Sequence, residues 1–176
     1  QINSLNVITY NEILSIQDWN NTTVEYQENE TLLFKFEAQA LKTPDEVALI
    51  FEETTLAYKA LDEKSNQVAH FLTQNGIKKN DIVAVSFKRS LEMMIYIYGI
   101  IKAGAAYLPV DIDIPSERLD FIINDAGAKI LFYNHDGITN NIQKTIDSFN
   151  IDVLNAEISL ITTCKNQIEV LPDDLA

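Results

Sequence analysis

The sequence predicts an α/β fold built around a mostly parallel sheet. Short apolar runs rich in β-branched residues alternate with longer amphipathic stretches, and turn residues separate the two kinds of segment. Strands that alternate with helices form βαβ units, in which successive strands lie parallel. The run at 82–87 is almost entirely apolar, as expected for a strand that is buried on both faces of a sheet.

The first thirty residues do not follow this pattern. Residues 8–19 have the composition of a short helix, which the Asn-Asn-Thr-Thr run at 20–23 would end. Asn and Thr side chains compete for local backbone hydrogen bonds and so favour turns and caps. We therefore expect residues 1–30 to form an irregular segment ahead of the folded domain.

From residue 31 onward, caps and apolar spacing define the elements. Thr31 fits a helix N-cap, Pro115 fits the first position of a helix, and glycines 76, 104 and 127 fit the ends of helices. The predicted helices cover residues 31–41, 58–74, 90–102, 115–126 and 140–149. The predicted strands cover residues 47–51, 82–87, 106–110, 129–133 and 151–154. The helix at 90–102 is apolar on almost every side, so we expect it to lie deep in the core.

Composition argues against several classes of function. The 176 residues carry a net charge of −13, and arginine occurs only twice, whereas nucleic-acid binding needs clustered cations. The longest apolar run, 93–101, is about half of a membrane span, and no signal-peptide pattern begins the sequence. The single cysteine fits a reducing compartment. We expect a cytoplasmic protein that binds neither nucleic acid nor membranes. The abundance of Ile and Asn suits an AT-rich bacterial genome.

Residues that usually carry catalysis are sparse. No two of the five glycines are close enough to form a glycine-rich phosphate loop. His70, inside a predicted helix, and His135, in a predicted turn, have no second His or Cys at metal-ligand spacing, and Cys164 has no histidine near it in sequence. The acidic pairs at 62–63 and 173–174 are interpreted as ordinary solvated positions. No catalytic residue and no metal site is predicted.

Asp111 and Asp113 form the one acidic pair with a functional alternative. They follow the strand predicted at 106–110, at the edge where open α/β sheets bind ligands. Two interpretations remain open. Either the pair shapes the turn into the helix that Pro115 begins, or it borders a ligand site.

Two segments resemble core motifs of the adenylation domains of non-ribosomal peptide synthetases. Residues 101–111, IKAGAAYLPVD, followed by PSERL at 115–119, are similar to the second core motif, L-K-A-G-x-A-Y-x-P-x-D with P-x-x-R-L after it. Residues 56–69, LAYKALDEKSNQVA, resemble the first, L-T-Y-x-E-L-N-x-x-S-N-x-L-A, although alanines 57 and 60 replace its usual Thr and Glu. The WNNT sequence at 19–22 resembles a turn in the linker between condensation and adenylation domains.

The resemblance implies that residues 1–30 are an interdomain linker and that 31–176 are the N-terminal part of an AMP-binding adenylation domain. The ending LPDDLA at 171–176 resembles the residues just before the third core motif, the loop that grips the ATP phosphates. The parent would use ATP and Mg to convert an amino or hydroxy acid to an acyl-adenylate, and would then load it on a carrier-protein phosphopantetheine. None of the family's ATP-binding or catalytic residues matches a position here, so the fragment alone is expected to be inactive.

The resemblance also implies a candidate site and a set of partners. In related acyl-CoA ligases the equivalent of loop 111–116 lies beside the path of the incoming thiol, so Asp111, Asp113 and Ser116 are candidates to border a phosphopantetheine channel. The partners would be the remainder of the adenylation domain, an upstream condensation domain and a downstream carrier domain. Separated from them, the piece would expose apolar surface and a sheet edge, so we expect self-association.

Three alternatives remain open. A stand-alone acyl- or aryl-CoA ligase would share the motifs, but it would not need the linker turn at 19–22. A flavodoxin-like binding or receiver module would fit the βαβ pattern alone, although only Glu52-Glu53 matches the acidic cluster that a receiver needs. A degenerate domain kept for scaffolding is the third.

Overall fold

A four-stranded parallel sheet forms the centre of the molecule in a computed structural model, which describes residues 8–25, 30–138, 146–166 and 168–174. The strand order is β4-β3-β5-β6, and every neighbouring pair is parallel. The strands are β3 (Ile82–Ser86), β4 (Ala106–Pro109), β5 (Ile130–Tyr133) and β6 (Asp147–Asn150). A separate antiparallel hairpin joins β1 (Val47–Phe51) to β2 (Thr54–Ala57). The predicted α/β fold with a mostly parallel sheet is confirmed.

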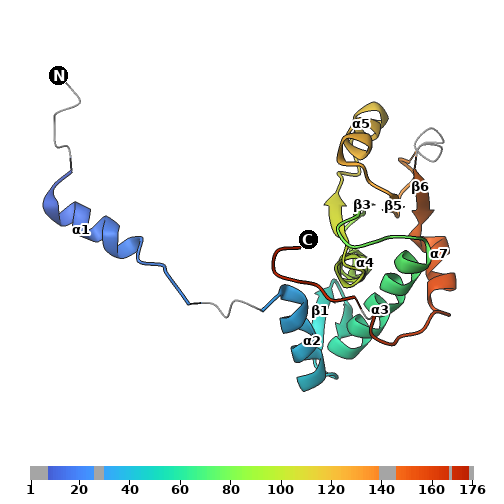
Figure 1. Cartoon of the computed structure of the whole chain (residues 1–176), viewed down its shortest axis with the longest axis horizontal. Helices are drawn as coiled ribbons and strands as arrows, with labels where there is room; N and C mark the ends of the chain where they lie inside the picture. The colour runs from blue at the N-terminus through green and yellow to red at the C-terminus, as the bar shows by residue number, and fades with distance from the viewer. Residues whose placement is uncertain (1–7, 26–29, 139–145, 167, 175–176) are drawn as a thin grey trace.

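Different helices cover the two faces of this sheet (Figure 1). The helices are α1 (Tyr10–Trp19), α2 (Leu32–Lys42), α3 (Tyr58–Gln74), α4 (Leu91–Lys102), α5 (Ser116–Ala126) and α7 (Ile151–Ile158). Val83 and Val85 of β3 face a large core shared with α2, α3, α4 and α7, whereas Ala84 faces a smaller core beneath α5. This alternation follows from the two-residue period of a strand. It explains why β3 is apolar throughout.

The close packing of α3 against α4 depends on Gly99. A Cβ atom added at Gly99 would lie 2.5 Å from the Cβ of Val68, which is closer than real side chains approach. The two helices therefore meet where one of them has no side chain. The prediction that the 90–102 segment would be deeply buried is confirmed, because Tyr96 and Ile100 are almost completely inaccessible.

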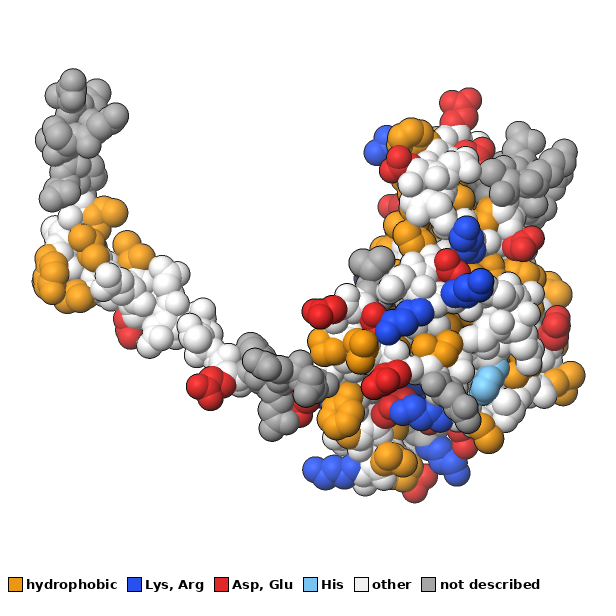
Figure 2. Space-filling view, viewed as in Figure 1, with side chains coloured by type: hydrophobic (Ala, Val, Ile, Leu, Met, Phe, Trp, Pro, Cys, Tyr) orange, Lys and Arg blue, Asp and Glu red, His pale blue; other side chains and the backbone are white. Residues whose placement is uncertain are grey.

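Helix α1 stands apart from the domain (Figures 1 and 2). Thr9 and Glu12 form a capping box at its start, but none of its residues is buried. Its apolar side chains are solvent-exposed, and Trp19 is 74% exposed. The short helix expected at 8–19 is confirmed. Residues 1–7 and 26–29 of the predicted linker lie outside the described residues.

Several predicted helix boundaries are confirmed by their caps. The Thr31 hydroxyl accepts a hydrogen bond from the N–H of Phe34, and Gly127 ends α5 in the left-handed conformation, with φ of 65°. Pro115 was expected at the first position of α5, but it occupies the N-cap, one position earlier. Ala57, at the N-cap of α3, provides no side-chain cap. Carbonyls of the turn between α2 and β1 replace that cap, because Glu46 accepts from the N–H of Tyr58 and Pro44 from that of Lys59.

The prediction for residues 140–154 is wrong where the structure describes them. The expected helix at 140–149 includes residues 140–145, which lie outside the described part, but its end forms strand β6 instead. The expected strand at 151–154 is the start of helix α7. Ile151, Leu154 and Ile158 share the buried face of that helix, and the Asn150 side chain caps it by accepting from the N–H of Asp152.

Candidate functional site

The two motif-bearing segments meet in a buried polar network centred on Lys102. This lysine ends α4, and its side chain is only 2% exposed. Its Nζ donates to Oδ1 of Asp62 at 2.6 Å, to the carbonyl of Asp62 at 3.0 Å and to Oδ1 of Asn66 at 2.8 Å. The same Nζ lies 5.3 Å from the centre of the Phe36 ring. Burial lowers the pKa of Lys102, and the hydrogen bond and charge of Asp62 oppose that shift.

This network is structural rather than catalytic. An ammonium group has three protons, and each of those on Lys102 has an acceptor within the protein. Asn66 uses its amide fully as well, because Nδ2 donates to the carbonyl of Thr163 at 2.9 Å and to Oδ2 of Asp62 at 3.3 Å. No donor of Lys102 is left to bind a substrate. Asp62, interpreted from the sequence as an ordinary solvated residue, is in fact a partner of this lysine, so that interpretation was wrong.

A C-terminal strap, defined as residues 159–166 and 168–174, crosses α3 and returns beside α2 (Figure 1). Side chains of α3 donate to its carbonyls: Gln67 Nε2 to Ile161 at 2.9 Å, Asn66 to Thr163, and His70 Nε2 to Cys164 at 2.9 Å. Farther along, Lys79 pairs with Asp174 at 2.8 Å. That contact lowers the pKa of Asp174, so this acid too is not the ordinary solvated residue expected.

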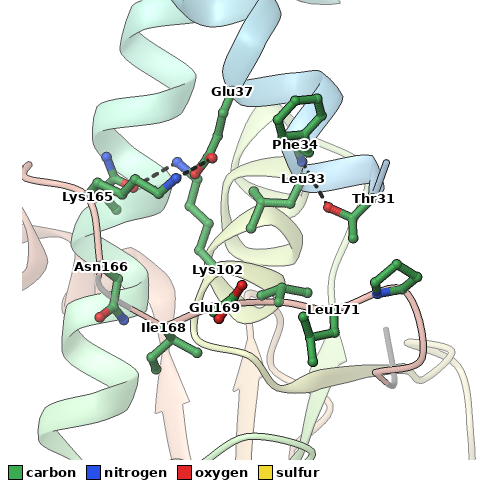
Figure 3. A pocket seen from close by; sticks show the side chains of 13 residues that line it. Thr31, Leu33, Phe34, Glu37, Lys102, Lys165, Asn166, Ile168, Glu169 and Leu171 are labelled. Atoms are coloured by element: carbon green, nitrogen blue, oxygen red, sulfur yellow. Dashed lines mark hydrogen bonds and ion pairs between the residues drawn. The ribbon is translucent and has the colours of Figure 1, made fainter. Parts of the chain in front are cut away.

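A cavity of about 310 Å³ lies between the strap, α2 and the end of α4 (Figure 3). Leu33, Ile168 and Leu171 line its apolar part, and Lys102 points from α4 toward the ion pair between Glu37 and Lys165. Glu37 pairs with Lys165, and Lys102 pairs with Asp62, whereas Glu169, which also lines the cavity, is exposed.

The edge where the parallel strands end carries a second polar cluster. Ser86 ends β3 and is completely buried, and its Oγ lies 2.9 Å from Nε2 of His135 in the turn after β5. The N–H of Gly137 donates to Nδ1 of the same ring at 3.0 Å. Beside them, the N–H of Lys88 donates to Oδ1 of Asn134 at 2.7 Å. The sheet topology brings these residues together although they are distant in sequence.

The hydrogen bonds fix the protonation state of His135. Since Nδ1 accepts from Gly137, it carries no proton, and Nε2–H must donate to Ser86 Oγ. Burial, followed by the charge of Lys88, lowers the pKa of His135, and Asp136 and Asp113 oppose this shift. A histidine that activates a serine must accept its proton. Ser86 is therefore not an activated nucleophile in this arrangement.

The three predicted site residues lie at this same edge. Oδ1 of Asp111 accepts from the N–H of Asp113 at 2.9 Å, so Asp111 shapes the turn into α5, as the first interpretation expected. Asp111 and Asp113 are exposed, and Ser116 is half-buried at the first position of α5. The Ser86–His135 pair beside them was missed by the sequence reasoning. Its only sequence signal was that both residues lie where a strand ends.

The other candidate residues do not join this cluster. His70 lies on α3 and contacts the strap, and Cys164 is exposed. Over the described ranges, no group of three or more His, Cys, Asp or Glu residues could hold a metal ion. No helix in that part of the chain has both the length and the apolar character to cross a membrane.

Comparison with known proteins identifies the family. A model described as AMP-binding enzyme matches residues 36–172. The chain belongs to the AMP-binding enzyme family. Members of this family form adenylates with ATP. The match begins within α2 and ends within the strap, so it includes both the Lys102 network and the sheet-edge cluster.

The relatives of this AMP-binding chain include non-ribosomal peptide synthetases. It is 45% identical over 120 residues to bacitracin synthase 3 of Bacillus licheniformis, covering 68% of this chain and 2% of that protein. It is 52% identical over 96 residues to zwittermicin A synthase ZmaJ of Bacillus cereus, covering 54% of this chain and 18% of that protein. The structure of the non-ribosomal peptide synthetase FmoA3 matches with a TM-score of 0.74 and 26% identity, over 92% of this chain and 17% of that one. The chain thus spans a small part of each relative.

Proposed function

We propose that this chain is part of a synthetase adenylation domain. That domain activates an amino or hydroxy acid with ATP and Mg, and loads it on the phosphopantetheine of a carrier domain. The supporting observation is that both motif segments pack together through Lys102 within the region matched by the AMP-binding model. An artificially fused adenylation and PCP di-domain, NpsA-ThdA of Klebsiella oxytoca, is similar over 82% of this chain at a TM-score of 0.70 and supports a carrier domain as a partner.

The described residues act in this proposal as a frame rather than as the chemical machinery. They do not fit ATP or Mg, because they provide no acidic cluster for a metal, and glycines 76, 99, 104, 127 and 137 stand too far apart for a phosphate loop. No reaction step is therefore assigned to them. Their contribution is to hold the end of the parallel sheet and the strap in fixed positions.

Loop 111–116 would border the path of the carrier thiol. Asp111 and Asp113 are exposed where a parallel sheet ends, the edge at which ligands approach α/β sheets. Residues 1–30 would be the linker to a condensation domain. The exposed apolar side chains of α1, including those of Leu14 and Trp19, support a role in contacting a neighbouring domain.

Pyrophosphate exchange tests the activation step. The domain encoded by the reading frame that contains this sequence should exchange labelled pyrophosphate into ATP in the presence of one amino or hydroxy acid. The 176-residue chain alone should not. Exchange by the chain alone, or no exchange by the encoded domain with any such acid, would contradict the proposal.

Transfer to the acceptor thiol tests the loop and the choice of partner. In the encoded domain, Asp113→Asn and Ser116→Ala should leave pyrophosphate exchange unchanged and slow the loading of the carrier. Glu117→Gln is the matched control, because Glu117 is exposed on the first turn of α5. Unchanged loading in both variants would remove the loop from the thiol path. Loading of free coenzyme A in preference to a carrier would instead favour a stand-alone ligase.

A further inference from the structure

The turn after β5 is built around a histidine that must be neutral. Both ring nitrogens of His135 are used, one to accept from the N–H of Gly137 and one to donate to the buried Oγ of Ser86. A proton added to Nδ1 would point at the N–H of Gly137, so two donors would oppose each other. The turn that holds Gly137 cannot keep this geometry once the ring is charged.

The same turn lies against loop 111–116. A Cβ atom added at Gly137 would lie 3.5 Å from the carbonyl oxygen of Ile112 and only 2.8 Å from Nδ1 of His135. Gly137 therefore packs directly against the imidazole, with no space for a side chain on that side, and the carbonyl of Ile112 lies at ordinary contact distance beyond it. A displacement of Gly137 toward loop 111–116 would bring it against Ile112. Asp113, the next residue, is held to Asp111 through its N–H.

The charges around His135 favour a different position for the protonated ring. Three charged side chains act on it from the elements that surround it: Lys88 from the segment after β3, Asp113 from the loop after β4, and Asp136 from its own turn. The imidazolium would be repelled by Lys88 and attracted by the two aspartates. The neutral ring instead faces Ser86. The surroundings thus offer one arrangement for each charge state.

We infer that His135 is a positioning residue for loop 111–116, and that protonation of its ring releases the loop from the arrangement seen here. Neutral His135 keeps Gly137 against Ile112 and so fixes Asp111 and Asp113 at the sheet edge. The charged ring leaves Ser86, turns toward the aspartates and frees Gly137. The importance of the loop for thiol transfer rests on the proposed function, but the coupling between His135 and the loop does not.

A pH titration of the ¹⁵N-labelled full chain tests this coupling. Between pH 8 and pH 5.5, the amide signals of Gly137 and Asp113 should move with the same midpoint as the ring of His135, below the usual value of about 6.5. If the Asp113 amide follows only carboxylate titration, near about pH 4, the inference is overturned.

Two variants distinguish the effect of the charge on the His135 ring from the effect of the position of that ring. In His135→Asn the side-chain oxygen can still accept from the N–H of Gly137 but cannot become charged, so the pH dependence at Asp113 should disappear. In Gly137→Ala the added methyl group must displace the ring at every pH. Hydrogen exchange at Asp113 should then be roughly fivefold faster than in the wild type, as for the loss of one hydrogen bond, at both pH 8 and pH 5.5. Persistence of the pH response in His135→Asn, or unchanged exchange in Gly137→Ala, would overturn the inference. Neither readout depends on catalysis, so a negative result leaves the proposed function intact.

Discussion

The ammonium of Lys102 donates a hydrogen bond of 2.8 Å to Oδ1 of Asn66, and this bond joins α4 to α3 inside the domain. Asn66 in turn binds the strap, because its Nδ2 donates to the carbonyl of Thr163. Three segments are therefore held by one buried polar network. Asp62 balances the charge, and its side chain is 32% exposed, so this acid reaches water although the lysine does not.

This asymmetry predicts unequal effects of removing the two charges. Asp62→Ala should lower the free energy of unfolding by about 3 kcal/mol, because it leaves a buried ammonium without its anion. Lys102→Met should cost about 1 kcal/mol, since it keeps the packing and water can solvate Asp62, although Asn66 loses a donor. Urea denaturation measures both. Lys165→Met, at an exposed ion pair with Glu37, is the control and should change stability by less than about 1 kcal/mol. Equal losses at positions 62 and 102 would contradict this account.

The contact between Gly99 and Val68 predicts that a better helix former will destabilise α4. Alanine normally stabilises a helix interior relative to glycine by about 1 kcal/mol. At position 99 the new methyl group would overlap Val68, so Gly99→Ala should instead cost about 2 kcal/mol. Gly127→Ala provides the comparison, because it has open space and only the left-handed backbone penalty of about 1 kcal/mol. Thermal denaturation distinguishes them, and a stabilised Gly99→Ala variant would refute the prediction.

The lowered pKa of His135 predicts a loss of stability in mild acid. The folded state resists protonation of this ring, whereas the unfolded chain takes up the proton near about pH 6.5. Between the folded pKa of His135 and about pH 6.5, the unfolded state therefore binds more protons than the folded state. The contribution of His135 to the unfolding free energy is fully present above about pH 6.5 and is lost as the pH falls through the folded pKa. The difference in unfolding free energy between wild type and His135→Asn should show this slope. A difference that does not vary with pH would rule out the assigned neutral state.

Exposed apolar residues on α2 predict self-association of the isolated chain. Leu32, Phe34 and Leu41 are 63%, 55% and 85% exposed. Apolar surface of this kind favours contact with another molecule, and the net charge of −13 is screened beyond about 8 Å at physiological salt. Light scattering at micromolar concentration should show a dimer or larger species. Phe34→Glu should weaken this self-association more than Ala38→Glu does, although both substitutions add the same charge to the same helix. A monomeric wild-type chain would contradict the expectation.

The sequence was sufficient to predict the elements in which apolar residues recur with the period of one kind of secondary structure, either a strand or a helix. Strand β3 and helices α3 and α4 were predicted because their core contacts are repeated along the element. The region 147–154 was misassigned for a physical reason. Strand β6 has the sequence DSFN, with one apolar residue, and it is a strand because β5 supplies its hydrogen bonds. Pairing of that kind depends on tertiary context and leaves little local signal.

The polar contacts of the candidate site could not be predicted from the sequence, because they too depend on tertiary structure. Ser86 and His135 are 49 residues apart and meet only because β3 and β5 are neighbours in the sheet. Lys102 and Asp62 lie in the two recognised motifs, but the resemblance alone did not indicate that these motif residues touch each other. Individual side-chain pairs become visible once strand order and helix packing are known.

The way in which α3 holds the strap has a consequence for how this family can diverge. Gln67, Asn66 and His70 bind carbonyl oxygens, which every amino acid possesses. Between residues 159 and 166 only Ile161 also packs against the large core. Apart from Lys165, whose side chain pairs with Glu37 on α2, the other residues of that stretch can be substituted without removing these hydrogen bonds. Mutational drift can therefore erase the sequence similarity of this stretch while every descendant keeps the same chain path.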